Sequence, residues 1–251
     1  MSDLPPAIVA AEAQEKATIR QYFGNRQGGV FVEVGANDPL SPESQSLHLE
    51  RELGWTGLLV EPQPALAEKA RQTRPASIVC QCACTAPESQ GELELSVPLV
   101  DGQRVTGHAA LGENLDEHNY RDFDRIRVPG VTLASLLDRH GIASVDLLSI
   151  DVEGAELEVL KGADLGRTQP RLILLEDKHL YLSKHRLLSR HGYRLVRRLN
   201  RNSWYVRAGE PIPEVPFGER ARLWKRMYVS IWYKKLVYAL RHKTLAPFCQ
   251  L

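Results

Sequence analysis

The 251-residue sequence has few cysteines and no pattern of a disulfide framework. Three of its four cysteines fall in the short stretch CQCAC, where Cys80, Cys82 and Cys84 alternate along a predicted strand and share one face. That geometry disfavours bridging among them, and no Cys/His set with metal-ligand spacing follows. We therefore expect small buried thiols in a reducing compartment.

The chain also lacks any uncharged apolar run of about eighteen residues or more, so no membrane-spanning helix is predicted. Its opening, MSDLPPAIVAAEAQEK, has no basic segment followed by an unbroken apolar core, which a secretory signal would need. With 43% apolar and 25% charged residues, the composition is that of a soluble domain with a substantial core. These features predict a cytoplasmic protein.

Charge is distributed unevenly along the chain. The whole sequence has a net charge of +1, but residues 184–251 contain sixteen Lys or Arg and only three Asp or Glu. This C-terminal quarter thus carries +13, and the rest of the chain carries −12. The asymmetry predicts that the C-terminal quarter meets an anionic partner, such as phosphate groups or a membrane surface.

Apolar segments rich in β-branched residues alternate with segments of helical period. The expected strands are 29–35, 57–62, 77–84, 91–97, 145–151 and 171–177, followed by a hairpin over 193–208. The expected helices are 7–23, 44–54, 64–73, 133–141, 153–163 and 182–191. This alternation predicts an α/β fold whose sheet is mainly parallel, with antiparallel strands at one edge. Residues 101–125 show no period and are predicted to form a functional loop or lid.

Several predicted strands end in carboxylates, at Glu33, Glu61 and Asp151 and at the pair Glu176 and Asp177. A strand that is buried on both faces rarely carries a charge, because burying an unpaired charge is costly. Ligands of open α/β sheets lie beyond the carboxyl ends of the strands. We therefore expect these side chains to face one crevice.

The loop GANDP after the first strand indicates the kind of ligand. Gly35 lets the backbone approach a ligand closely, and Glu33 can pair with a cationic group. Glu61, at the end of the second strand, can accept both hydroxyls of a ribose. The loop lacks the third glycine of a dinucleotide fingerprint and offers a pyrophosphate no cradle. S-adenosylmethionine (SAM), which has a ribose and a cationic end but no phosphate, fits this pattern better than NAD.

The segments FVEVGAND, GWTGLLVEPQP, VDLLSIDVEGAELEVLKGA and LILLE resemble the FkbM-type methyltransferases over residues 28–207. The resemblance implies a Rossmann-like class I methyltransferase sheet and SAM-dependent O-methylation of hydroxyls on sugars or related metabolites. It places the methionine end of SAM near Asn37, the adenine near Cys84 and the methyl group before Asp151. The cofactor-binding residues that it implies are Glu33, Gly35, Ala36, Asn37, Glu61, Pro62, Ala83, Cys84 and Asp151.

Methyl transfer to a hydroxyl needs a group that removes the proton. The candidates are Asp151, Glu153, His179 and His108, and an unperturbed histidine pKa of about 6.5 suits this task. For either histidine a surface or structural role is the alternative. Glu156 is expected to be a charge that stabilises a helix N-terminus.

A metal offers a second route. Asp151, Glu176 and Asp177 resemble the Mg²⁺ arrangement of catechol-type O-methyltransferases, and oxygen ligands of this kind suit Mg²⁺.

The basic segment 217–245 is expected to form an amphipathic helix. One face would hold Tyr228, Val229, Trp232, Leu236, Ala239 and Leu240, and the opposite face Arg226, Ser230, Lys234 and Arg241. Lysines interleaved with Trp and Tyr are typical of a helix in a membrane interface, which would place the protein peripherally at the inner face of the membrane. Docking on its own domain and a contact between copies in a homo-oligomer are the alternatives, and nucleic acid is disfavoured.

The chain divides into an N-terminal helical segment (1–27), a methyltransferase domain (28–208) and the basic C-terminal helix (209–251). The leading interpretation is an O-methyltransferase for a glycan hydroxyl, presented on a lipid-linked or lipopolysaccharide precursor at the cytoplasmic face of a membrane. The alternative is a non-catalytic adaptor with a SAM-binding fold, whose basic segment recruits a partner or a membrane.

Overall fold

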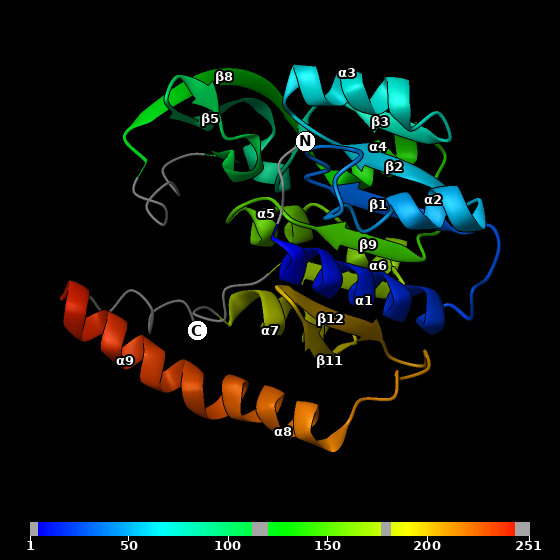
Figure 1. Cartoon of the computed structure of the whole chain (residues 1–251), viewed down its shortest axis with the longest axis vertical. Helices are drawn as coiled ribbons and strands as arrows, with labels where there is room; N and C mark the ends of the chain where they lie inside the picture. Colours follow the sequence, from blue (N-terminus) through cyan, green and yellow to red (C-terminus); the bar gives the residue numbers. More distant parts are fainter. Residues whose placement is uncertain (1–4, 112–119, 177–181, 244–251) are drawn as a thin grey trace.

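The computed structural model describes residues 5–111, 120–176 and 182–243. A seven-stranded sheet with the order β11-β12-β10-β9-β1-β2-β3 forms its centre (Figure 1). The strands are Val30–Val34 (β1), Thr56–Val60 (β2), Ser77–Cys80 (β3), Leu147–Ile150 (β9), Leu172–Glu176 (β10), Tyr193–Leu199 (β11) and Asn202–Arg207 (β12).

Five strands of this sheet pair in parallel: β1, β2, β3, β9 and β10. β12 runs antiparallel to both of its neighbours, β10 and β11. The predicted α/β sheet, mainly parallel with an antiparallel hairpin near its C-terminal end, is confirmed. From β1 the chain builds outward to β3, then returns to the other side of β1 with β9 and β10. The order therefore reverses between β1 and β9, where open α/β sheets bind their ligands.

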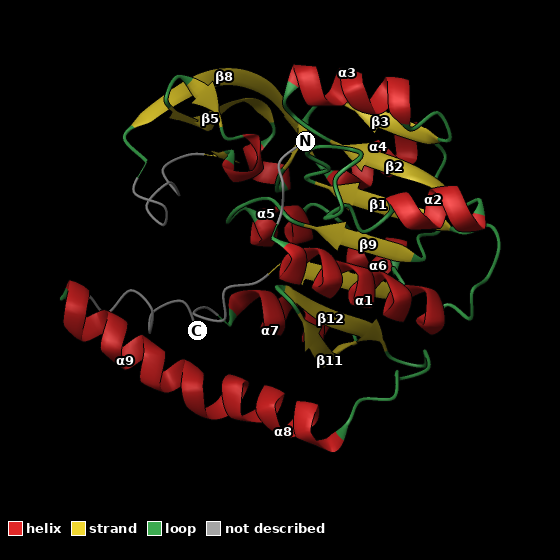
Figure 2. Cartoon of the chain, viewed as in Figure 1, coloured by secondary structure: helices red, strands yellow, loops and turns green. Residues whose placement is uncertain are grey.

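Helices cover both faces of the sheet (Figure 2). One face packs against α1 (Pro6–Tyr22), α2 (Leu47–Leu53) and α3 (Pro64–Thr73), and the other against α4 (Leu133–Arg139), α5 (Glu156–Lys161), α6 (Leu165–Thr168) and α7 (Ser183–Arg190). Alternation along the strands supplies both cores: Phe31 packs with the first set of helices, and Val32 and Val34 pack with the second.

A buried carboxylate ties α1 to the hairpin. Glu15 is fully buried and accepts hydrogen bonds from Trp204 Nε1 (2.8 Å), Asn202 Nδ2 (3.1 Å) and Asn200 Nδ2 (3.1 Å). Burial raises the pKa of Glu15 to about 7, although these donors and above all Trp204 favour its charged form. The N-terminal helix and the last strands of the sheet therefore form one polar joint.

A second sheet stands beside the carboxyl edge of the first, with the order β4-β8-β5-β6, and β7 pairs with β5. Its strands are Ala83–Cys84 (β4), Gly91–Val100 (β5), Gln103–Arg104 (β6), Ala110–Leu111 (β7) and Asp122–Val131 (β8). β5 and β8 form a long antiparallel pair that projects past the carboxyl ends of β1 and β2 (Figure 1).

This second sheet corrects two sequence predictions. The single strand expected over 77–84 is wrong, because the chain leaves the main sheet after Cys80 and Ala83 then pairs with Gly130 in the second sheet. Cys82 and Cys84 are buried and Cys80 is half-buried, and all three pack on the same hydrophobic core. Cys80 Sγ lies 3.3 Å from His140 Nε2. The loop expected over 101–125 is also wrong in part, since its described residues include β6, β7 and the start of β8.

The C-terminal segment forms one long helical rod made of α8 (Phe217–Lys225), a π-helical turn (Arg226–Ser230) and α9 (Ile231–His242). The rod, orange to red in Figure 1, runs along the side of the domain that holds β11 and β12. Glu219 in the first turn of the rod forms an ion pair with Arg197 of β11, with 3.0 Å between nitrogen and oxygen. This pair holds the start of the rod against the sheet. Within the described ranges, no helix combines the length and apolar character needed to cross a bilayer.

Candidate active site

A cavity that is open to solvent at its mouth lies beyond the carboxyl ends of β1, β2 and β9. This is where the strand order reverses. The second sheet and the 3₁₀ turn Thr106–His108 form the opposite wall.

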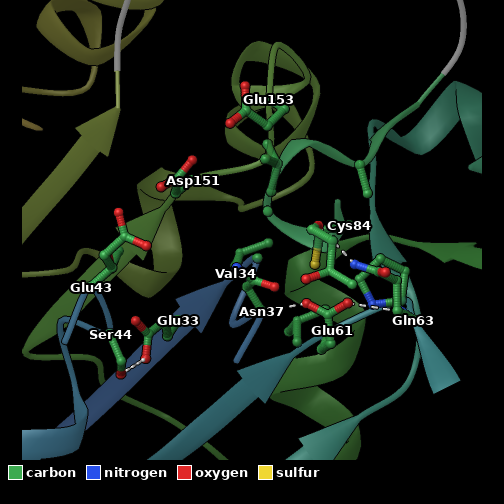
Figure 3. Close-up of a pocket in the computed structure, with 18 of the residues that line it drawn as sticks. Glu33, Val34, Asn37, Glu43, Ser44, Glu61, Gln63, Cys84, Asp151 and Glu153 are labelled. Atoms are coloured by element: carbon green, nitrogen blue, oxygen red, sulfur yellow. Dashed lines mark hydrogen bonds between the residues drawn. The ribbon is translucent and has the colours of Figure 1, made fainter. Parts of the chain in front are cut away.

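Most of the predicted site residues meet in this cavity (Figure 3). Those that line it are Glu33, Gly35, Asn37, Glu61, Pro62, Ala83, Cys84, Asp151 and Glu153. Ala36 instead packs in the hydrophobic cluster around Trp55. Glu176 ends β10 next to Asp151 without being part of the lining, and Asp177 and His179 lie outside the described residues. The convergence of acidic strand ends is thus seen for Glu33, Glu61 and Asp151.

Gly35 is required by the geometry of the cavity floor. Its φ is +85°, and a Cβ at this position would lie 1.8 Å from the carbonyl oxygen of Asp151. The strand tips are also joined directly, because Asp151 N donates to Val34 O at 3.0 Å. The loop after β1 can therefore turn against the tip of β9 only with glycine at this position.

Glu61 is held in place by two backbone amides. Its Oε2 accepts from Asn37 N at 2.7 Å and its Oε1 accepts from Gln63 N at 2.9 Å (Figure 3). Burial raises the pKa of this carboxylate, and the two amides act in the opposite direction by favouring its charged form. Each oxygen has a second lone pair, so the fixed carboxylate can accept two further hydrogen bonds from a ligand.

Glu33 has a different setting from the one that the sequence suggested. Its carboxylate accepts from Ser44 Oγ at 2.9 Å, from Gln45 N at 2.8 Å and from Ser46 Oγ. These residues precede α2, so Glu33 anchors the loop that forms one wall of the cavity. A ligand cation would meet a carboxylate that already has three donors.

Three amide oxygens at the cavity are buried and have no hydrogen-bond partner: Asn37 Oδ1, Gln45 Oε1 and Gln63 Oε1. The orientation of two of these amides is fixed by their nitrogens. Gln45 Nε2 donates to Glu12 Oε2 at 2.8 Å, and Gln63 Nε2 donates to Thr106 O at 3.1 Å. Buried acceptors are normally satisfied. A ligand that brings an ammonium group, ribose hydroxyls and an adenine amine would supply the missing donors, so the site fits SAM.

Asp151, Glu153 and Glu176 form an acidic cluster whose ligand-type oxygens all lie within 4.8 Å of one another. The Asp151 side chain is exposed to solvent at the cavity, although many protein atoms crowd around it. Burial raises its pKa well above the ordinary value, and the hydrogen bond and charge of Glu176 and the charge of Glu153 raise it further. Glu153 stands in the left-handed region, with φ of +50°, so the turn that carries it is strained.

Arg201 is the cation nearest to this cluster among the residues on these walls. It reaches in from the turn between β11 and β12, with Nε 3.1 Å from Glu176 Oε1 and one terminal nitrogen 3.0 Å from Glu43 Oε1. Arg201 and Asn202 both line the cavity. The hairpin therefore supplies a positive charge to an otherwise acidic wall.

Several lining residues were absent from the sequence prediction. Glu12 of α1, the amides of Gln45 and Gln63, and Arg201 all contribute to the walls. Gln63 has a visible signal, since it follows Glu61 and Pro62 at a strand end. Glu12 and Arg201 have none, because each is brought to the site by an element distant in sequence.

Two further predicted residues have defined places. His108 lines the cavity, with Nδ1 2.6 Å from Tyr120 Oη. Glu156 lies in the first turn of α5, as expected, where it accepts from Gly154 N at 2.8 Å and pairs with Lys184 Nζ at 3.0 Å. The helix expected to start at 153 begins at Glu156, because Glu153 and Gly154 both have positive φ.

Comparison with known proteins gives a family assignment. Residues 33–195, well over half of the chain, match the family model described as the methyltransferase FkbM domain. One solved structure that matches is a precorrin-6y C5,15-methyltransferase from Geobacter metallireducens GS-15, at 12% identity over 76% of this chain and 85% of that chain, with a TM-score of 0.38. No curated protein matches. By its family match, the chain belongs to the FkbM methyltransferases.

Proposed function

We propose that this methyltransferase acts on a hydroxyl group of a sugar, glycan or related metabolite, with Asp151 as the base. Family membership implies SAM as the methyl donor. The observation that carries the proposal is the setting of Asp151, a cavity-facing carboxylate at a strand tip whose pKa is raised by burial and by Glu176. A carboxylate with a raised pKa is a stronger base than an ordinary one, and a hydroxyl acceptor needs such a base.

The residues that would hold SAM follow from the vacant acceptor positions. Glu61 is oriented to take the ribose hydroxyls. The unpartnered oxygens of Asn37, Gln45 and Gln63 are available for the ammonium group and the adenine amine. When bound, SAM would supply a methyl group on a positively charged sulfur. The acceptor oxygen would bond to the methyl carbon as the sulfur leaves, which gives the methyl ether and S-adenosylhomocysteine.

The chain's own contribution to the reaction is proton removal and charge placement. Asp151 takes the proton from the acceptor hydroxyl while the hydroxyl oxygen forms the new bond to the methyl carbon. Glu153 and Glu176 keep the proton affinity of Asp151 high and place negative charge close to its tip. His108, paired with Tyr120 on the opposite wall, is a second candidate base. His179 stays a sequence prediction.

The acidic cluster fits Mg²⁺ only in part. Three carboxylates with oxygens within 4.8 Å are a suitable donor set, and Glu153 joins Asp151 and Glu176 in it. However, Glu176 already pairs with Arg201, and a guanidinium competes with a dication for the same oxygens.

The test is SAM turnover against a panel of nucleotide sugars, free glycans and lipid-linked glycans, followed by release of S-adenosylhomocysteine. We expect turnover with at least one hydroxylated acceptor and its loss in Asp151→Asn, which should still bind SAM. Lys161→Gln, an exposed change on α5, is the control that should retain turnover. SAM binding without turnover on any acceptor would favour the non-catalytic adaptor, and an undiminished rate in Asp151→Asn would exclude Asp151 as the base.

A further inference from the structure

The rod formed by α8, the π-helical turn and α9 exposes an unusual row of large apolar side chains. Trp224, Tyr228, Trp232, Leu236 and Leu240 follow one another at intervals of four residues, and 61, 61, 41, 51 and 71% of each is exposed. Such residues normally pack inside a protein or against a partner, so a row of this length indicates an interaction surface.

A second row on the same rod faces the protein. Met227, Ile231 and Lys235 also stand four residues apart, and all three are buried. Positions four apart drift around an α-helix, because one turn holds 3.6 residues. The wider π-helical turn at Arg226–Ser230 offsets this drift. The rod can therefore keep one row against the domain while the aromatic row stays outside.

The charge around the aromatic row is of one sign. Glu219 is the last acidic residue of the chain, and every charged residue after it is Lys or Arg. Arg222, Lys225, Arg226 and Lys234 are exposed on the rod. Two such rods placed together would oppose like charges, which disfavours a second copy as the occupant.

Nucleic acid would also be a poor match, because the phosphate backbone is bound by cations and the most prominent side chains here are apolar. An anionic bilayer matches both features. Trp and Tyr suit the interface between acyl chains and headgroups, and flanking Lys and Arg are attracted to acidic lipids.

We infer that residues 217–243 lie in the headgroup region of an anionic membrane surface, with Trp224, Trp232 and Leu236 inserted and the cations on lipid phosphates. The far end of α9 extends past the edge of the sheet at which β1 and β9 end (Figure 1). A surface bound by the exposed row would lie on the side of the domain that holds β11 and β12. The inference about the membrane holds whatever the acceptor of the methyl group.

The four tryptophans provide a direct test. Trp55 and Trp204 are fully buried in the core, whereas Trp224 and Trp232 are exposed on the rod. Added vesicles of phosphatidylglycerol should shift the tryptophan emission to the blue, and lipids brominated on their acyl chains should quench it. Neutral phosphatidylcholine vesicles should do neither. The variant Trp224→Phe/Trp232→Phe keeps the buried pair and should lose both signals.

Flotation of the full-length protein with the same vesicles measures the affinity. Arg226→Gln and Lys234→Gln should each weaken binding about fivefold, as expected for one charge near an acidic surface. Leu236→Ser/Leu240→Ser should weaken it further, and Ile212→Ser, an exposed apolar residue before the rod, is the matched control. Far-UV circular dichroism shows whether each variant keeps its fold.

Three outcomes would overturn the inference. The first is no flotation and no spectral shift with anionic vesicles. The second is a blue shift of the emission of the two exposed tryptophans when the protein concentration is raised without lipid, together with a dimer in sedimentation velocity. That result would make a second copy of the chain the occupant of the surface. The third is binding to RNA in a band-shift assay together with unchanged flotation of Leu236→Ser/Leu240→Ser.

Discussion

Replacing Glu61 by glutamine is the most direct test of the cofactor site. The substitution keeps the shape of the side chain but turns one acceptor oxygen into an NH₂ group. In the native structure both oxygens are acceptors, one for Asn37 N and the other for Gln63 N. In the glutamine variant the side-chain NH₂ group faces the N–H of either Asn37 or Gln63, so two donors oppose each other. The negative charge that would accept the ribose hydroxyls is also lost.

The size of the effect follows from the number of bonds that change. Hydrogen bonds to a charged group contribute about 1.5–3 kcal/mol each. Loss of the anionic acceptor for ribose hydroxyls, together with displacement of the Asn37 amide, should therefore cost SAM binding about 3 kcal/mol. That corresponds to a Kd about 100-fold higher.

Isothermal titration with SAM and with S-adenosylhomocysteine measures this loss, and circular dichroism at the titration temperature shows that the variant is folded. Glu68→Gln is the matched control, because Glu68 is an exposed residue of α3, outside the cavity, whose carboxylate accepts hydrogen bonds from Arg71 and Gln72. The control should leave Kd unchanged. A folded Glu61→Gln protein whose Kd lies within about threefold of the parent would refute the assignment of Glu61 to the cofactor.

The remaining predictions concern the cavity floor, the buried joint and the acidic cluster. Gly35→Ala places a methyl group against the carbonyl of Asp151 in a left-handed conformation, and urea denaturation should show a loss of about 3 kcal/mol or more. The pKa of Glu15 is raised from 4.5 to about 7. The stabilisation of the folded state that comes from binding this proton is therefore fully present below pH 4.5 and is lost as the pH rises through 7. The free energy of unfolding of the parent protein, minus that of Glu15→Gln, should fall by on the order of 3 kcal/mol over that pH range. A difference that does not change with pH would contradict the raised pKa. Turnover should resist EDTA, because Arg201 already pairs with Glu176, and a tenfold loss restored by Mg²⁺ would reveal a metal site after all.

The sequence predicts the parallel part of the main sheet well because each parallel strand is a mostly apolar run that is followed by a polar residue or a glycine. The same logic identifies Glu61 and Asp151, since a carboxylate at the end of a buried strand must reach solvent or a ligand. It also identifies Gly35, although only the structure shows that the constraint comes from the carbonyl of Asp151.

Other features depend on contacts between distant segments, and local patterns do not reveal them. The move from β3 to β4 within CQCAC depends on pairing with Gly130, which comes about 50 residues later in a segment of mixed character. Glu33 is bonded by Ser44 and Ser46, whose hydroxyls have no sequence signature of that role. The sequence around Arg201 indicates only a turn between two strands. Its pairing with Glu176 follows from the position of the hairpin beside β10.

The joint between α1 and the hairpin has a consequence for synthesis on the ribosome. Glu15 is made early, but its three donors, Asn200, Asn202 and Trp204, are made near the end of the domain. Until they emerge, the first helix has no partner for its central carboxylate, and Arg201 is missing from the cavity wall. A nascent chain therefore gains its complete ligand site only after the last strand of the sheet has been translated.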